Sequence, residues 1–394
     1  MSDTFYCLYC AADKPNSDAS LEHAIPQFMG GDSSPKKFHL TNVCRTCNNR
    51  LGLFVDAAYA KSWFVTNILS EAARGLCTAT SDPGLPLACM GPTILPDLAL
   101  GADQISEYWI GPSGESIIWV RAHDERMDSY SGGNPIDAKK KESVVYFVPT
   151  SSDPVRFELG NRSFHRAFDK RKIRKIFCAE IKDENGLTFD PSIFGFDAPV
   201  GDDENNRVAI LAAIRSGTIH SKITVNTKFD LRFICKLALA VGYSIFGMEY
   251  LNSEASLELR KGLWPKQGGS MPNIKGKPTL PFGDLRFASL VGYPGAAAIM
   301  LMKVNNHWML TVSIDEKLPF SISIGPDSMD SDHVNSEEGY SLLLFPYLNM
   351  AIELTTASLL AHRLGSLKNT ELKQLDDRMG DAMKFNAKLA PMPM

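Results

Sequence analysis

The chain has 394 residues, of which 44% are hydrophobic and 22% are charged. This composition excludes an intrinsically disordered protein, and at about 150 residues per domain the length predicts two domains. The formal net charge of −4 excludes a general attraction to nucleic acid, so any DNA-binding surface must be local.

The first residues have neither the basic start nor the apolar run of a secretory signal. The most apolar late stretch is interrupted by Pro346, Asn349 and Glu353, so it does not offer the roughly 20 apolar residues of a membrane span. We therefore expect a cytoplasmic protein with no membrane partner.

Four of the eight cysteines form two CxxC pairs near the N-terminus, separated by thirty-three residues: Cys7 and Cys10, then Cys44 and Cys47. A two-residue gap lets both sulfurs of a tight turn face one ion, and four such thiolates bind zinc tetrahedrally. Redox-active dithiols are the alternative. Because four protein ligands leave no open position for a substrate, we expect a structural zinc. The other four cysteines stand singly and are expected to be buried.

Residues 1–52 lack long periodic patterns, as is typical of a small module that a metal stabilises. Helical spacing of apolar residues then predicts a helix from Leu53 to about Ala73, with Gly75 as its stop. Proline and glycine in residues 76–101 indicate an irregular connection. We therefore expect a module over residues 1–75 and a larger region over 76–394, with a sub-boundary near 250–275.

The larger region begins with β patterns. Two aromatic and β-branched runs flank GPSG in residues 107–123, which predicts a hairpin, and residues 144–151 and 155–160 continue the β pattern. Apolar residues nearly all round residues 229–247 predict a buried helix. Residues 285–315 are predicted to form strands with a turn at Asn305 and Asn306, and roughly the last 40 residues are predicted to be helical.

The most basic stretch begins at Asn161 and is predicted to be helical. On a helix its charges would cover most of one face, opposed only by Asp169, and would either track phosphates or form a solvated surface. The charges are Arg162, Arg166, Lys170, Arg171, Lys172, Arg174 and Lys175.

Further parts of a pattern lie between and around the cysteine pairs. They are EHAIP at residues 22–26, glycines at 30 and 31, and TNVCRTCNN at residues 41–49, which includes the second pair and is followed by Gly52. Together with the CxxC pairs, in this order, they resemble the zinc-stabilised branch of the HNH endonuclease family. The resemblance covers roughly the first 56 residues. It implies a ββα-metal fold, and so an α+β protein in which this HNH module precedes a larger mixed α/β region.

The resemblance also implies roles for single residues. His23 takes the place of the general base, Glu22 that of a ligand of the catalytic metal, and Asn42 that of the asparagine that braces the loop of the base. Asn48 takes the place of the last metal ligand. Oxygen ligands from Glu22 and Asn48 suit Mg²⁺ or Mn²⁺ and not zinc, so two metals with separate functions are implied. His39 is expected to be structural or to face a phosphate.

An endonuclease of this kind would act on DNA. Lys36, Lys37, Arg45 and Arg50 flank the predicted site, and each could contact a phosphate. Arg171, Lys172 and Arg174 are the candidates for DNA contact in the basic stretch. The alternative of a different class is a zinc-finger-like module that binds DNA or protein without catalysis.

The region after the module is far longer than phosphodiester cleavage requires, so it is expected to position the substrate, form a homo-oligomer or regulate the enzyme. Its size and layout are similar to bacterial anti-phage effectors of the HNH family, in which a C-terminal sensor binds a nucleotide second messenger. No residue motif of the sequence identifies such a sensor.

Overall fold

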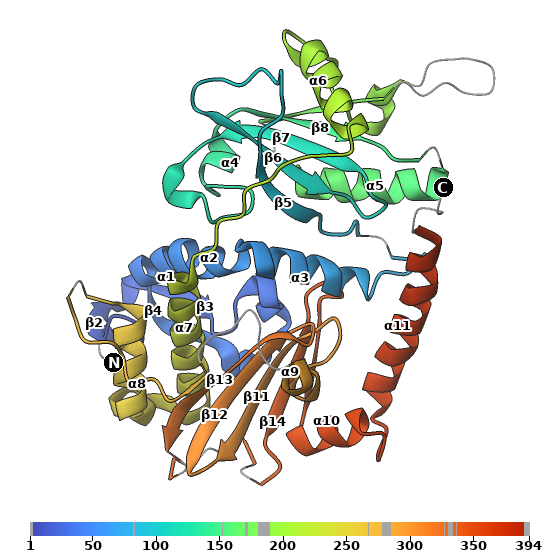
Figure 1. Cartoon of the computed structure of the whole chain (residues 1–394). Coiled ribbons are helices and arrows are strands. Elements are labelled where there is room, and N and C mark those ends of the chain that lie inside the picture. Colours follow the sequence, from blue (N-terminus) through green and yellow to red (C-terminus); the bar gives the residue numbers. More distant parts are fainter. Residues whose placement is uncertain are drawn as a thin grey trace. The chain divides into compact units, whose positions relative to one another are not determined.

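The structure of the chain is a computed structural model (Figure 1). It describes residues 3–81, 83–151, 153–169, 172–179, 190–266, 268–277, 285–326, 328–329, 334–335 and 337–389. These residues form two compact units, each built from two separate stretches of chain. Unit 1 comprises residues 1–60 and 226–378, and unit 2 comprises residues 61–225 and 379–394. The chain is therefore divided at other positions than the predicted boundary at residue 75.

The N-terminal module of unit 1 consists of two small hairpins followed by a helix. The antiparallel pairs are β1 (Thr4–Cys7) with β2 (Ala12–Pro15), and β3 (Ala19–His23) with β4 (His39–Cys44). The helix α1 (Arg45–Leu51) follows β4 directly and continues through a π-helical turn, η5 (Gly52–Asp56), into α2 (Ala57–Ala60). The arrangement of strands and helix confirms the predicted ββα module with a larger mixed region behind it.

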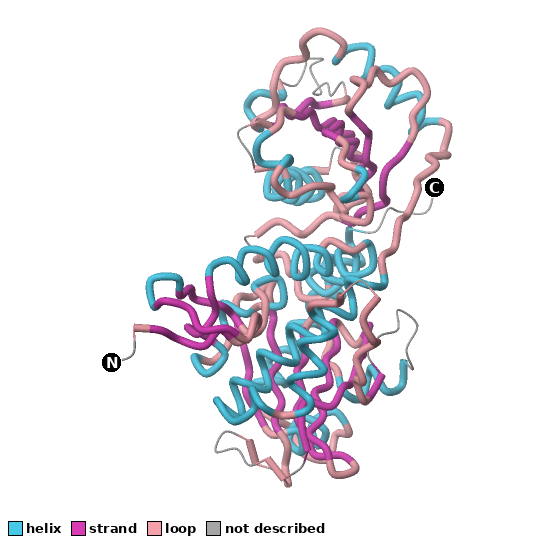
Figure 2. Tube along the Cα trace, turned by 90° about the vertical axis from the view of Figure 1, so that its left-hand side faces the viewer, coloured by secondary structure: helices cyan, strands magenta, loops and turns pink. Residues whose placement is uncertain are grey.

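The second part of unit 1 is a six-stranded sheet with helices beside it. The strand order is β10-β13-β12-β11-β14-β15, and every neighbouring pair is antiparallel. The strands are β10 (Gly276–Lys277), β11 (Ala297–Val304), β12 (His307–Ile314), β13 (Lys317–Pro326), β14 (Tyr340–Phe345) and β15 (Met350–Leu354). The helices are α7 (Thr227–Phe246), α8 (Glu254–Leu263), α9 (Leu285–Val291) and α10 (Thr356–Arg363), and α11 (Thr370–Leu389) begins in this unit. Figure 2 shows the helices of this unit lying over the strands.

Two predictions for this part are confirmed. The β11–β12 hairpin turns at Asn305 and Asn306, which have φ angles of 48° and 61°. Asparagine tolerates this left-handed conformation, which a two-residue hairpin turn requires. The predicted buried helix is α7, in which residues 233–241 are all buried. The stretch Asp230–Asn252 is long and apolar enough to cross a membrane. However, 61% of its apolar 18-residue window is buried inside the structure, as in a core helix.

Unit 2 is built on a five-stranded sheet with the order β5-β6-β7-β8-β9. Side chains alternate between its two faces. Ile117, Val145 and Phe147 pack with α5 in one buried cluster, whereas Ile118 and Tyr146 pack with α6 in another. The strands are β5 (Ala88–Thr93), β6 (Gln104–Ile110), β7 (Ser116–Ala122), β8 (Ser143–Val148) and β9 (Ile173–Phe177); the helices are α3 (Trp63–Arg74), α4 (Asp137–Lys140), α5 (Pro154–Ala167) and α6 (Asp203–Arg215). The β6–β7 pair confirms the predicted hairpin.

Several sequence predictions are wrong. Residues 285–291, predicted as strand, form the helix α9, and the predicted irregular connection over residues 76–101 contains β5. Residues 155–160 are not a strand, because Asp153 caps the N-terminus of α5 and Pro154 fits its first turn. The basic stretch is not one helix: α5 ends at Ala167, and β9 follows as a strand parallel to β8. The predicted helix over 53–73 is interrupted at Lys61 and Ser62, where unit 1 passes into unit 2.

Candidate functional site

The four cysteines predicted to bind zinc lie together. Their sulfur atoms are all within 4.8 Å of one another, which fits one tetrahedral ion. Cys7 ends β1 and Cys10 lies in the turn before β2, whereas Cys44 caps the N-terminus of α1 and Cys47 lies in its first turn. The backbone N–H of Cys44 donates to Cys7 Sγ at 3.3 Å. The side-chain hydrogen bond with Cys47 lowers the pKa of the Cys7 thiol, whereas burial raises the pKa of Cys10 and the hydrogen bond with Cys7 raises that of Cys47. The cluster joins the first hairpin to the second.

The β3–β4 hairpin positions His23 at the end of its first strand. In the hairpin register His23 lies opposite His39, and their rings meet edge to face with centroids 4.8 Å apart. The Nε2 atom of His23 lies 3.4 Å from Oδ1 of Asp32, and the exposed fractions of these side chains are 20% and 64%. Asp32 also accepts a hydrogen bond from Gln27 Nε2 at 3.1 Å. A partly exposed imidazole beside a carboxylate can accept a proton from solvent.

The two glycines after EHAIP allow the chain to bring Asp32 to His23. Gly30 has a φ of 92°, a left-handed conformation that other residues rarely adopt. A Cβ on Gly31 would lie 1.8 Å from the carbonyl oxygen of Ile25, so only glycine fits there. Sequence reasoning assigned no function to Asp32. The tight turn between the histidine and this aspartate is the signal that could have found it.

Glu22 points to the other side of β3, because neighbouring residues of a strand alternate. Only 5% of this residue is exposed. Its Oε1 accepts a hydrogen bond from the Tyr9 hydroxyl at 3.0 Å and lies 2.6 Å from Nζ of Lys236. The sequence predicts Glu22 as a ligand of the catalytic ion, but the structure places its carboxylate in the interior, paired with an ammonium group. Spacing along the sequence could not reveal this partner, which is 214 residues away.

Asn48 lies in α1, immediately after the last cysteine. Its Nδ2 donates to the carbonyl oxygen of Leu21 at 2.8 Å and to Ser20 Oγ at 3.2 Å. The side chain therefore ties the helix to the strand that carries His23. With Nδ2 committed to β3, Oδ1 is the side-chain atom that could bind a cation, and a role as metal ligand stays a prediction.

Asn42 lies in β4, where its carbonyl oxygen accepts a hydrogen bond from the N–H of Leu8 at 3.1 Å. Its Nδ2 is buried and has no hydrogen-bond partner among the described residues. The residue that lies opposite His23 in the hairpin is His39. His39 therefore contacts the predicted base, and the bracing role of Asn42 stays a prediction.

The basic residues near the module differ in how far they are engaged. Lys37 pairs with Glu353 at 2.5 Å and lies over the ring of Tyr340. Arg50 lies over the ring of Trp264, and Arg45 donates to the carbonyl oxygen of Ser17 at 3.5 Å. Lys36 is exposed and forms no ion pair within the described part of the chain. Contacts of these residues with DNA stay predictions.

In unit 2 the basic stretch is divided between elements. Arg174 of β9 pairs with the buried carboxylate of Asp203 at 2.5 Å, so its charge is already compensated. Burial raises the pKa of Asp203, but hydrogen bonds from Arg174, the N–H of Val200 and Tyr146 outweigh this effect and lower it overall. Lys172 is exposed. Arg171 lies outside the described residues.

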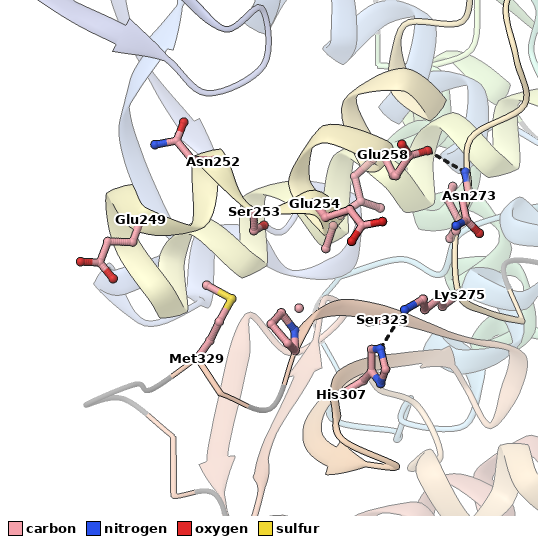
Figure 3. A pocket seen from close by; sticks show the side chains of 15 residues that line it. Glu249, Asn252, Ser253, Glu254, Glu258, Asn273, Lys275, His307, Ser323 and Met329 are labelled. Atoms are coloured by element: carbon pink, nitrogen blue, oxygen red, sulfur yellow. Dashed lines mark hydrogen bonds between the residues drawn. The ribbon is translucent and has the colours of Figure 1, made fainter.

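A separate pocket of about 420 Å³ lies in unit 1 between η8 (Gly247–Asn252), α8 and the β12–β13 strands (Figure 3). Three carboxylates line it, those of Glu249, Glu254 and Glu258. Lys275 donates from Nζ to Nε2 of His307 at 3.1 Å, and His307 donates from Nδ1 to a carbonyl oxygen at 2.9 Å. Lys275 is the one lysine or arginine among the lining residues that the structure describes.

Comparison with known proteins finds a family match for part of this chain. Residues 7–64 match the family model described as HNH endonuclease. No curated protein and no solved structure matches the chain. The matched segment contains the cysteine cluster, the β3–β4 hairpin and α1. Over residues 7–64 the N-terminal module is therefore similar to the HNH endonuclease family.

Proposed function

We propose that the chain is a metal-dependent endonuclease that hydrolyses DNA phosphodiester bonds, with His23 as the general base. The observation that carries this proposal is the position of His23 within the matched HNH segment. Its ring is partly exposed at the end of β3 and lies beside the Asp32 carboxylate, which no cation contacts among the described residues. A rigid hairpin, fixed by the cysteine cluster, carries it.

Proton transfer follows from the orientation of the ring. Because Nε2 faces a carboxylate, this nitrogen carries the proton, and Nδ1 is the atom left to accept a proton from water. Asp32 then stabilises the imidazolium that forms, and it holds the ring in one tautomer. Imidazole exchanges protons near neutral pH, so it suits the activation of water at cellular pH.

A divalent ion in such a site would neutralise charge on the phosphate and the leaving oxygen. Glu22 does not fit as its ligand, because Lys236 and Tyr9 already hold the carboxylate and only 5% of the residue is exposed. The dependence on Mg²⁺ or Mn²⁺ that the HNH family implies stays a prediction, which chelation with EDTA and readdition of each ion would test.

The direct test is cleavage of supercoiled plasmid DNA with Mg²⁺ or Mn²⁺. We expect nicked or linear products from the wild type, and their loss in His23→Ala. His220→Ala is the matched control, since this exposed histidine of unit 2 lies outside the HNH module. Equal cleavage by the wild type and His23→Ala would contradict the proposal.

The alternative is a zinc-finger-like module that binds DNA or protein without catalysis. It predicts DNA binding that His23→Ala leaves unchanged and no cleavage under any metal condition. The exposed His23–Asp32 pair favours the enzyme, because a purely structural finger needs no carboxylate beside a solvent-accessible imidazole.

A role as an anti-phage effector regulated by a nucleotide messenger, and assembly into a homo-oligomer, stay predictions. The pocket of unit 1 is one place where a small molecule could bind. Its three carboxylates and one lysine give no particular support to a ligand with several phosphates, because like charges repel.

A further inference from the structure

Lys236 is a lysine in the interior of a protein. It lies in α7, within the otherwise apolar run of residues 233–241, and its side chain is 1% exposed. Lysine is almost never fully buried unless it is paired. The reason for its presence must therefore be its partners.

Two carboxylates share its charge. Nζ of Lys236 lies 2.6 Å from Oε1 of Glu22 and 2.6 Å from Oδ2 of Asp56. Both partners belong to the HNH module: Glu22 comes from β3, and Asp56 ends the π-helical turn η5 that follows α1. The Tyr9 hydroxyl adds a third polar contact, donated to Glu22. Strand, helix and α7 thus meet at one ammonium group.

The groups around Lys236 could also bind a metal cation. Two carboxylates and a hydroxyl are oxygen donors that also suit a divalent ion. Oδ1 of Asp56 is buried and has no hydrogen-bond partner among the described residues, so a further lone pair is available there. Glu22 is buried and the Asp56 side chain is 18% exposed, so two carboxylates so close together would be unfavourable without a cation. Desolvation still raises the pKa of Asp56, although the charge of Lys236 opposes this effect.

We propose that Lys236 is the resident cation of this site, and that it takes the place a divalent ion would otherwise fill between Glu22 and Asp56. Glu22 is then a positioning residue, which anchors the strand that presents His23, and not a metal ligand. The positioning role of Glu22 in catalysis rests on the proposed function of His23. The identity of the occupant is independent of whether the domain cuts DNA.

The test removes the ammonium and offers a metal in its place. In Lys236→Ala we expect the melting temperature to fall by about 5 °C or more. Mn²⁺ should restore much of this loss, and electron paramagnetic resonance should count one more bound Mn²⁺ than in the wild type. Adding Glu22→Gln to Lys236→Ala should abolish both effects. Lys261→Ala, at an exposed lysine of α8, is the matched control and should gain no Mn²⁺.

A Lys236→Ala protein that folds but gains neither Mn²⁺ nor Mn²⁺-dependent stability would overturn the proposal. If the variant does not fold, Glu22→Gln in the otherwise wild-type chain decides the question, since Lys236 still pairs with Asp56 there. We expect its Mn²⁺ affinity to stay within about twofold of the wild-type value, including no binding in either protein. A loss of tenfold or more would make Glu22 a metal ligand and contradict the inference. Because these readouts are binding and stability, an inactive nuclease would not affect them.

Discussion

Two polar centres stabilise the N-terminal module, and they differ in where their residues come from. The cysteine cluster draws all four ligands from residues 7–47, whereas the second centre joins Glu22 and Asp56 to Lys236, far along the chain. The first could form within the module alone. The second makes the module depend on α7. A family motif can therefore define a local metal site while a distant residue determines the role of the neighbouring carboxylate.

The largest expected effect comes from breaking the local centre. In Cys47→Ser we expect loss of zinc and unfolding of residues 3–60, because structural zinc contributes about 10 kcal/mol or more in small modules. Hydrogen exchange with mass spectrometry and zinc analysis would measure this. Cys77→Ser, at a buried single cysteine of unit 2, should keep the zinc and the protection of the module. Retained protection in Cys47→Ser would show that the second centre suffices.

Breaking the second centre, at Lys236, should lower the stability less than loss of the zinc does, but the loss should still be large. We expect Lys236→Met to lower the free energy of unfolding of unit 1 by about 3–5 kcal/mol, because it leaves the buried Glu22 and the partly exposed Asp56 without a cation. Lys261→Met removes an exposed ion pair with Glu258 and should cost less than about 1 kcal/mol. Chemical denaturation of both variants would compare them. Equal costs would mean that burial does not distinguish the two lysines.

The ion pair between Arg174 and Asp203 in unit 2 can be tested by its pH dependence. The folded state lowers the pKa of Asp203. Its contribution to stability is therefore complete above the ordinary aspartate pKa of about 3.9 and is lost as the pH falls through the lower folded value. Asp203→Asn should remove this acid-dependent loss, whereas Asp202→Asn, at the exposed neighbour, should not. Thermal unfolding between about pH 2 and pH 6 would follow it.

The smallest effect is expected at the exposed lysines of the module. Lys36→Ala should reduce the slope of log binding constant against log salt by about one, if this side chain neutralises a phosphate. Lys37 is paired with Glu353, so Lys37→Ala should change the slope less. Fluorescence anisotropy with labelled DNA at several salt concentrations would measure both. A larger change for Lys37→Ala would mean that its ion pair opens when DNA binds.

Local patterns accounted for much of the fold. The CxxC pairs, the β6–β7 hairpin, the Asn305–Asn306 turn and the buried helix α7 each depend on residues close in sequence, and the structure confirms them. The strand predicted at residues 155–160 failed because the capping residue Asp153 outweighs a short β-like pattern. The single basic helix failed because β9 gains its hydrogen bonds from β8, a long-range contact.

The candidate site was predictable to a similar extent. The cysteine pairs predicted the cluster that fits a structural zinc, because their spacing is fixed by local chemistry. The role of His23, which EHAIP suggested, stays a prediction. Asp32 was missed since no motif letter pointed to it, and only the turn at Gly30 and Gly31 brings it to His23. Lys236 could not be found at all, because nothing in an apolar helix states which carboxylates it will meet.

The proposed role of His23 is to transfer the proton in DNA hydrolysis. The pH dependence of single-turnover plasmid cleavage, compared between wild type and His23→Ala, tests it most directly. We expect the wild-type rate to exceed that of His23→Ala by about 100-fold or more at neutral pH, and the pH profiles of the two proteins to differ. The same profile and rate in both proteins would contradict the claim.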